Sequence, residues 1–298
     1  MSAEGLARAL GGRKAGVAWM ARCPVHDDRE PSLSIADARG GKVLVRCHAG
    51  CDQRDVIAAL RARGIWGADD RRPIRFSRKL DRVQQHELAG DAIKRTEAAL
   101  AIWHGTQSAE GTPVETYLRS RGVIVPIPPS IRFHAGLKHP SGAVWPGMVA
   151  LVTHGAHGKR IGIHRTFLTR DGSAKAPVEP KKMMLGLCCG GALRLAHAGD
   201  VLMVGEGIET CLAAMQASGH TAWAALSTSG LRALDLPREV RDVIVLADGD
   251  DPGEAAALNC AWRWKREGRR VRIARAPQGM DFNDLLLRRA PRIEEVAR

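Results

Sequence analysis

Four short apolar segments in the last third of the chain, VLMVG, TAWAAL, DVIVLA and RVRIAR, restrict the fold more than any other feature of the sequence. None of them alternates apolar with polar residues, which is typical of strands that are buried on both faces. Segments with helical character separate them, at residues 208–219, 229–236 and 252–268. Strands that alternate with helices in this way predict an α/β fold with a central parallel sheet.

Acidic residues follow three of these predicted strands. Glu206 comes directly after VLMVG, Asp248 and Asp250 follow DVIVLA, and Asp281 lies in the loop after RVRIAR. Because parallel α/β sheets bind ligands at the carboxyl ends of their strands, we expect these acids to meet at one edge. Spaced carboxylates hold hard cations such as Mg²⁺ or Mn²⁺, which neutralise charge in phosphoryl transfer. The sequence therefore predicts a catalytic Mg²⁺ or Mn²⁺ site.

Other roles are open to some of the acids in this region. Asp250 or Asp251 suits the N-cap of the helix that follows, although a cap does not explain Glu206. We interpret Glu209 as a first-turn acid that complements the helix dipole rather than as a support for the metal site. Asp284 could serve only as the cap of the next helix.

A second cluster of ligand-type residues lies near the N-terminus, as the pairs Cys23-x2-His26 and Cys47-x3-Cys51. Two close pairs that are separated by the length of one β-hairpin suit a tetrahedral zinc ion. Four protein ligands leave no open position, so the predicted zinc is structural and stabilises a small module. His48 lies between the two later cysteines and is an alternative ligand to His26 or Cys51.

The formal net charge of +13 favours a polyanionic partner. Residues 131–182 concentrate this charge, with nine Lys or Arg against two acids. We expect the basic side chains in and after a predicted hairpin at residues 147–169 to contact nucleic acid or nucleotide. The predicted contacts are Arg165, Lys175, Lys181 and Lys182. A merely solvated basic face, or an Arg-rich composition, is the alternative interpretation.

Composition and periodicity divide the chain into four parts. Residues 1–67 form the predicted Cys/His module, residues 68–82 a basic linker, residues 83–198 a basic α+β subdomain, and residues 199–298 the α/β domain. No apolar run approaches the roughly 20 residues of a membrane span, and the N-terminus lacks a signal-peptide core. We expect a cytoplasmic protein without a membrane partner.

The segments VLMVGEGIET, VIVLADGDDPGE and MDFNDLL resemble the Toprim fold. The segments CPVHDDREPSLSI and VRCHAGC resemble the zinc ribbon of DnaG-type primases and of phage or plasmid primases. The order of zinc ribbon, linker, basic subdomain and Toprim domain is the primase order, and the resemblance covers nearly the whole chain. It implies that Glu206 is an acid/base or a metal ligand, and that Asp248 and Asp250 are a metal-binding pair.

Three positions depart from the primase pattern. Thr210 stands where many DnaG-type enzymes have a further carboxylate, Asp281 lies in MDFND rather than in a DPD motif, and the second zinc pair is Cys-x3-Cys rather than Cys-x2-Cys.

The resemblance implies a primase of phage or plasmid type, which makes short RNA primers from NTPs on a single-stranded DNA template in DNA replication. It would use structural Zn²⁺ and catalytic Mg²⁺ or Mn²⁺. The chain has no Walker loop, so we expect the replicative helicase to be a separate protein. A Toprim metal-dependent nuclease and a non-catalytic replication factor that binds single-stranded DNA are the alternatives.

Overall fold

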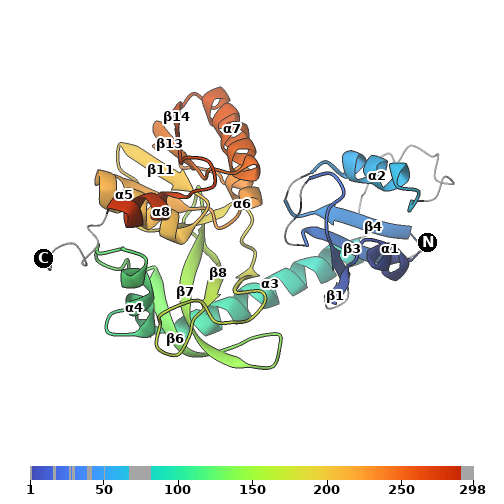
Figure 1. Cartoon of the computed structure of the whole chain (residues 1–298), viewed down its shortest axis with the longest axis horizontal. Coiled ribbons are helices and arrows are strands. Elements are labelled where there is room, and N and C mark those ends of the chain that lie inside the picture. The colour runs from blue at the N-terminus through green and yellow to red at the C-terminus, as the bar shows by residue number, and fades with distance from the viewer. Residues whose placement is uncertain are drawn as a thin grey trace, which may run out of the picture. The chain divides into compact units, whose positions relative to one another are not determined.

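The computed structural model describes residues 2–15, 18–26, 28, 31–38, 42–49, 51–66 and 82–289 of the 298-residue chain. The chain divides into two compact units, residues 1–79 and 80–298 (Figure 1). The predicted basic linker, residues 68–82, lies outside the described residues except for Arg82. Within the described ranges, no helix combines the length and the apolar character that a membrane crossing requires.

The first unit is a small antiparallel sheet with two helices. Its strands pair in the order β1 (Arg13–Ala15), β2 (Ala18–Ala21), β3 (Leu33–Ala38) and β4 (Lys42–Cys47), with α1 (Ala3–Ala9) and α2 (Gln53–Ala62) beside them. Asp52 caps α2 by accepting a hydrogen bond from the Arg54 N–H. Leu6, Ile35 and Leu60 are fully buried and join the helices to the sheet. The β3–β4 register places Cys47 opposite Leu33, at the base of this core.

The second unit is built on one ten-stranded sheet in which a parallel half and an antiparallel half are joined edge to edge. The parallel half contains β14 (Arg270–Arg275), β13 (Asp242–Ala247), β11 (Val201–Gly205) and β12 (Thr221–Ala224), in that order. The short strand β10 (Gly191–Arg194) pairs antiparallel with both β12 and β7 (Val144–His154). The remaining strands are β5 (Gln107–Ser108), β6 (Ile131–Lys138), β8 (Arg160–Phe167) and β9 (Lys182–Gly186).

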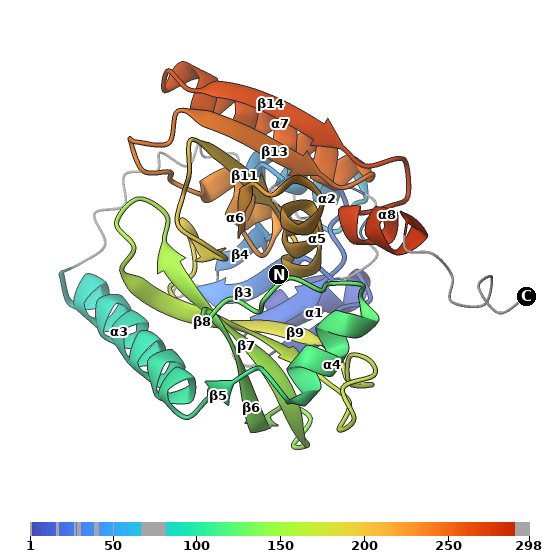
Figure 2. The ribbon, with the colours of Figure 1, turned by 90° about the vertical axis from the view of Figure 1, so that its left-hand side faces the viewer.

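Helices cover both faces of the parallel half (Figure 2). On one face lie α5 (Ile208–Ser218) and α8 (Phe282–Arg289), and on the other α6 (Thr228–Ala233) and α7 (Asp251–Arg266). The strands are therefore buried on both sides, which is why they contain unbroken apolar runs rather than alternating ones. The predicted parallel sheet with its intervening helices is confirmed.

The antiparallel half lies between two further helices. Trp103 of α3 (Arg82–His104) packs with Phe167 on one face, while α4 (Pro113–Ser120) covers the other. Thr112 caps α4 with its hydroxyl, and Pro113 occupies the first turn, where its missing N–H costs nothing. The predicted hairpin at residues 147–169 corresponds to β7 and β8.

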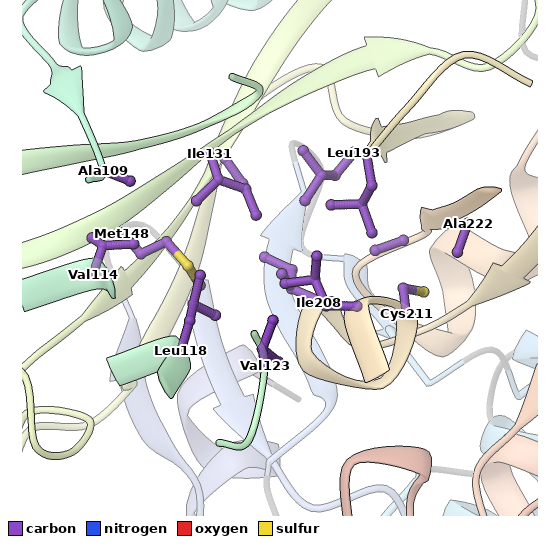
Figure 3. Packing of buried hydrophobic residues seen from close by; sticks show 14 of the residues in the cluster. Ala109, Val114, Leu118, Val123, Ile131, Met148, Leu193, Ile208, Cys211 and Ala222 are labelled. Atoms are coloured by element: carbon purple, nitrogen blue, oxygen red, sulfur yellow. The ribbon is translucent and has the colours of Figure 1, made fainter. Parts of the chain in front are cut away.

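One hydrophobic core joins the two halves of this sheet (Figure 3). Leu118 of α4 and Met148 of β7 point toward Ile208 and Cys211 of α5, and all four side chains are buried. The described parts of the two predicted domains, residues 83–198 and 199–298, thus share both a sheet and a core. This shared core fixes the position of α5, whose first turn carries part of the site described below.

Candidate functional site

Carboxylates from separate strands meet in a pocket at the carboxyl edge of the parallel sheet. Glu206 directly follows β11 and Asp248 directly follows β13, and these strands are neighbours in parallel register. Their side chains line a pocket of about 130 Å³ together with Asp281. The pocket also has basic walls. Its complete lining is Arg121, His164, Lys175, Lys182, Glu206, Gly207, Ile208, Glu209, Thr210, Leu226, Asp248 and Asp281.

Gly249 allows Asp281 to approach the other two acids. A Cβ atom at this position would come within 2.0 Å of the Pro277 carbonyl oxygen, so only glycine fits. The Gly249 N–H donates to the Met280 carbonyl at 2.9 Å, and its carbonyl accepts from the Gly279 N–H at 2.7 Å. The loop after β14 is thereby held against the loop after β13. The close packing of these two loops thus explains why a glycine stands between Asp248 and Asp250.

Asp281 and Asp284 together cap α8. Asp281 Oδ1 accepts from the Asp284 N–H at 2.8 Å, and Asp284 Oδ2 accepts from the Asp281 N–H at 3.1 Å. This reciprocal arrangement satisfies orphan donors of the helix and fixes the Asp281 carboxylate. The N-cap is therefore Asp281, which also lines the pocket, whereas Asp284, the expected cap, completes the capping box from the first turn of α8.

Asp250 differs from the other predicted metal ligands. Its Oδ1 accepts a hydrogen bond from the Gly253 N–H at 2.7 Å, which makes it the N-cap of α7. It does not line the pocket, although its charge raises the pKa of both Glu206 and Asp248. Of the two residues expected to suit the cap, Asp250 is therefore the one that performs it.

The carboxylates of this pocket destabilise one another's charge. Burial, together with the negative charges of Glu206, Asp281 and Asp250, raises the pKa of Asp248 to about 7. Burial also raises the pKa of Glu206, against the opposing effect of Lys182. Buried acids that raise one another's pKa need a positive charge among them to be ionised together. Carboxylate oxygens are the ligands that Mg²⁺ and Mn²⁺ prefer, so Glu206, Asp248 and Asp281, which share this pocket, are the candidate ligands of a divalent cation.

The structure separates the four predicted basic contacts. Lys175 and Lys182 line the pocket. Lys181 is half exposed, and its Nζ lies 3.7 Å from Glu179 Oε1. Arg165 lies on the opposite face of β8 from the pocket-lining His164, since successive residues of a strand point to opposite faces. The basic wall of the pocket thus contains two of the four.

Glu209 lies in the first turn of α5, as expected, but it also lines the pocket, which the sequence did not indicate. Its Oε1 accepts a hydrogen bond from Tyr117 Oη at 2.5 Å and lies 3.0 Å from Lys175 Nζ. Burial alone would raise the pKa of this carboxyl, but the charge of Lys175 and the bond from Tyr117 outweigh it and hold the pKa at about 2. Glu209 is therefore ionised, and its charge is already matched by Lys175.

Two further pocket residues, His164 and Arg121, were not expected from the sequence. Burial and the charge of Lys182 lower the pKa of His164 to about 4, so its ring is neutral at pH 7. The buried Nδ1 of His164 and Nε of Arg121 lack a hydrogen-bond partner among the described residues. Buried polar atoms are usually paired, so these two are suited to a ligand or water in the pocket. The alternation of side chains along the predicted strand could have placed His164 on one of its faces. No feature of the sequence near Arg121 indicates that it lines the pocket.

Thr210 and Leu226 complete the wall around Asp248 and Glu206. Thr210 is buried, and its hydroxyl lies 3.5 Å from Asp248 Oδ1, where it lowers the pKa of that carboxyl slightly against the larger opposing effects. Leu226 has a φ of 68°, a left-handed conformation that is rare for residues with a side chain. Its N–H donates to the Glu206 carbonyl at 2.9 Å, which holds the chain at the end of β11. Strained backbone of this kind is common beside functional sites.

The first unit contains a second candidate site. The ligand atoms of Cys23, His26, Cys47 and Cys51 all lie within 4.8 Å of one another. His26 Nδ1 lies 3.2 Å from Cys51 Sγ and 4.0 Å from Cys47 Sγ. Burial and the charges of the neighbouring thiols raise the pKa of Cys51 to about 12, so the thiols need a cation to ionise together. Three sulfurs and one imidazole nitrogen at these distances fit a tetrahedral metal ion.

Asp28 orients this cluster. Its Oδ2 accepts hydrogen bonds from the Cys23 N–H at 2.6 Å and from the Ser32 N–H at 3.0 Å, which closes the first turn. Its Oδ1 lies 3.4 Å from His26 Nε2 and so directs Nδ1 of that ring toward the cysteines. A carboxylate behind a ligating histidine is typical of metal sites. His48 is not part of the cluster.

Comparisons with known proteins match two segments of the chain. Residues 93–195 match the model of a domain of unknown function, and residues 201–292 match the model of the Toprim domain. No curated protein sequence matches the chain significantly.

Among solved structures, the DnaG catalytic core is similar with 18% identity and a TM-score of 0.44, over 68% of this chain and 75% of that one. A DNA primase domain from Pseudomonas aeruginosa shows 17% identity and a TM-score of 0.42, over 68% and 74%. The Aquifex aeolicus primase, with its zinc-binding and RNA polymerase domains, shows 15% identity and a TM-score of 0.39, over 98% and 81%.

The family match coincides with the parallel half of the sheet. It begins at Val201, the first residue of β11, and includes Glu206, Asp248 and Asp281. The C-terminal part of this chain, residues 201–292, is a Toprim domain.

Proposed function

We propose that this chain is a DNA primase of phage or plasmid type, which joins ribonucleotides on a single-stranded DNA template. The observation that carries the proposal is the pocket of the Toprim domain, in which Glu206, Asp248 and Asp281 face Arg121, Lys175 and Lys182. Acids that need a cation, beside two cationic side chains without an acidic partner among the described residues, Arg121 and Lys182, suit a nucleoside triphosphate with its divalent metal. We propose the boundaries 1–67, 83–198 and 199–298 for zinc ribbon, basic subdomain and Toprim domain.

The reaction forms one P–O bond and breaks another. The 3′-hydroxyl oxygen of the growing strand bonds to the α-phosphorus of the incoming NTP, the bond to the β-phosphate breaks, and pyrophosphate leaves. Bound Mg²⁺ or Mn²⁺, held by Glu206, Asp248 and Asp281, would reduce the negative charge that develops on the phosphate oxygens. Asp250, whose Oδ1 caps α7, would act on the cation through its charge or its second oxygen.

The chain's own residues position the substrate and move the proton. Lys182 and Arg121 are suited to the phosphates of the NTP, because neither makes an ion pair with any residue in the described ranges. Lys175 would contribute its remaining N–H donors while Glu209 holds it in place. Glu206 could accept the proton that the attacking hydroxyl loses with the carboxylate oxygen that does not hold the cation. The neutral ring of His164 can hydrogen-bond a phosphate or ribose oxygen.

The Cys/His cluster supports a structural zinc in the first unit, which we propose engages the template. Lys181 and Arg165 lie outside the pocket, and we propose that they contact the nucleic-acid backbone. A separate replicative helicase would supply unwinding, and we propose a cytoplasmic location.

The test is primer synthesis. Wild-type protein, Glu206→Gln and Asp248→Asn are incubated with single-stranded DNA, labelled NTPs and Mg²⁺ or Mn²⁺. Short RNA products from the wild type, lost in both variants, support the proposal. Glu254→Gln is the matched control, because Glu254 pairs with Arg275 outside the pocket and should leave synthesis unchanged. Cleavage of the DNA would instead identify a nuclease, and binding without product a non-catalytic replication factor.

A further inference from the structure

An exposed tryptophan lies on α7, away from the carboxylate pocket. Trp262 is 70% exposed, whereas Trp264, two residues later, is fully buried against the sheet. Asp250 caps α7 beside the carboxylates, and a helix rises 1.5 Å per residue, so Trp262 lies about 18 Å along the axis from the cap. The surface around Trp262 is therefore distinct from the proposed active site.

Polar and basic side chains surround this indole. Trp262 lines a shallow hollow of about 510 Å³ together with Asn259, Arg263, Arg266 and Glu267. Leu258 is the one other large apolar side chain of α7 that is exposed among the described residues. Two apolar residues cover far less than the roughly 800 Å² per partner of an ordinary protein interface. The hollow is thus an isolated aromatic platform rather than an apolar docking surface.

The charge of this region is strongly positive and only partly neutralised. Residues 258–275 contain seven Lys or Arg and a single acid, Glu267. Arg263, Arg269, Arg270 and Arg275 are paired with acids. Lys265, Arg266 and Arg272 form no ion pair with any described residue. Glu267 is itself paired with Arg269, so the free charge beside Trp262 is cationic.

We propose that Trp262, Asn259 and Arg266 form a second contact for single-stranded nucleic acid. An unpaired base stacks on the Trp262 indole, the Asn259 amide hydrogen-bonds the edge of the base, and the Arg266 guanidinium contacts a phosphate. An exposed aromatic ring next to free cations is the combination that binds single strands, because every base has a face to stack and every nucleotide a phosphate. A double helix keeps its bases stacked inside and offers no such face. This contact does not depend on catalysis at the carboxylate pocket.

The test measures binding of an end-labelled oligothymidylate by fluorescence anisotropy, without nucleotides or added Mg²⁺ or Mn²⁺. We expect Trp262→Ala to weaken binding about 5-fold or more, and Trp262→Phe to retain part of the affinity. Arg266→Gln should weaken binding. It should also reduce the slope of log K, the association constant, against log salt concentration by about 1, because one phosphate contact is lost. Leu258→Ala is the matched control on the same helix face and should bind like the wild type.

A strand with abasic sites separates stacking from charge. The wild type and Trp262→Ala should bind the abasic strand equally, because no base is left to stack. Trp262 is exposed, so its replacement should leave the melting temperature unchanged. An equal affinity of Trp262→Ala and wild type for oligothymidylate would overturn the proposal. So would a loss of self-association, or of binding to an acidic protein, in Trp262→Ala with DNA binding intact.

The outcome is independent of the primase proposal. Glu206→Gln should bind oligothymidylate like the wild type even though it makes no primers. If Trp262→Ala loses DNA binding while neither protein makes primers, the strand contact stands and the primase proposal fails. If the wild type makes primers and Trp262→Ala binds oligothymidylate normally, the primase proposal stands and the second strand contact fails.

Discussion

Lys175 and Glu209 form an ion pair across the two halves of the second unit, with Nζ 3.0 Å from Oε1. Lys175 comes from the loop between β8 and β9, whereas Glu209 lies in the first turn of α5. The same oxygen accepts a hydrogen bond from Tyr117 of α4. Three segments far apart in the sequence thus converge on one buried carboxylate. The pair fixes the Lys175 ammonium group relative to Glu206, which lies three residues before Glu209.

Removal of Lys175 should destabilise the protein. Lys175→Met leaves the largely buried Glu209 carboxylate without its counter-charge. Because the Lys175 side chain is 30% exposed, the loss of unfolding free energy should be below the about 3–5 kcal/mol that breaking a fully buried ion pair costs. Urea denaturation at neutral pH measures this loss. Lys181→Met is the control, since Lys181 is half exposed and its pairing should contribute less than about 1 kcal/mol. The double variant Lys175→Met, Glu209→Gln should recover most of the loss, and equal losses in both single lysine variants would contradict the ion pair's role.

The metal-free protein should become less stable as pH rises. Asp248 has a pKa of about 7 in the folded protein and an ordinary value of 3.8, so the folded state binds the extra proton between these values. The free energy of unfolding therefore falls as pH rises from 3.8 to about 7. The loss should be smaller than the about 4 kcal/mol that the full shift represents, because solvent screens part of it.

Urea denaturation without divalent cations at about pH 5 and about pH 8 tests this slope. Asp248→Asn should reduce the slope and be more stable than the wild type at the higher pH. Glu206 has a raised pKa as well, so some slope should remain. A slope that is unchanged in Asp248→Asn would contradict the raised pKa.

The parallel half of the fold could be predicted from the sequence, and so could the meeting of Glu206, Asp248 and Asp281 at its edge. Strands buried on both faces need unbroken apolar runs, and helices must return the chain between parallel strands, so residues 200–275 could be interpreted locally. The acids at the ends of β11 and β13 follow from the same topology, because the carboxyl ends of parallel strands share an edge. Cap and ligand were harder to distinguish, as Asp250 shows.

The basic wall could not be predicted, because it depends on contacts between distant segments. Tyr117 and Glu209 are 92 residues apart, and nothing near Glu209 in the sequence indicates its partners. Arg121 reaches the pocket because Asn283 of α8 donates to its carbonyl at 2.6 Å, a contact over 162 residues. Composition indicated a basic middle segment, but only the packing of β8 and β9 distinguishes Lys182 from Lys181 and Arg165.

Zinc content should distinguish His26 from His48. His26→Ala removes a ligand atom from the Cys/His cluster and should lower the bound zinc, whereas His48→Ala should retain it. Chelation of the wild-type metal should unfold the first unit, because the free energy of metal binding contributes to the folding of a small module. Elemental analysis gives the zinc content, and circular dichroism follows the unfolding. Loss of zinc in His48→Ala with retention in His26→Ala would reverse the assignment.

Binding of Mn²⁺ to the carboxylate pocket should depend on pH through Asp248. A cation competes with the proton on this carboxyl, so the affinity should fall up to about tenfold per pH unit below the pKa of about 7 and level off above it. Thr210 hydrogen-bonds Asp248 and lowers its pKa, so Thr210→Val should move the bend in this profile to higher pH by a few tenths of a unit. Calorimetric titration gives the profile, with Glu254→Gln as a control that should match the wild type. A profile without a bend near neutral pH would mean that Asp248 is not among the cation's ligands.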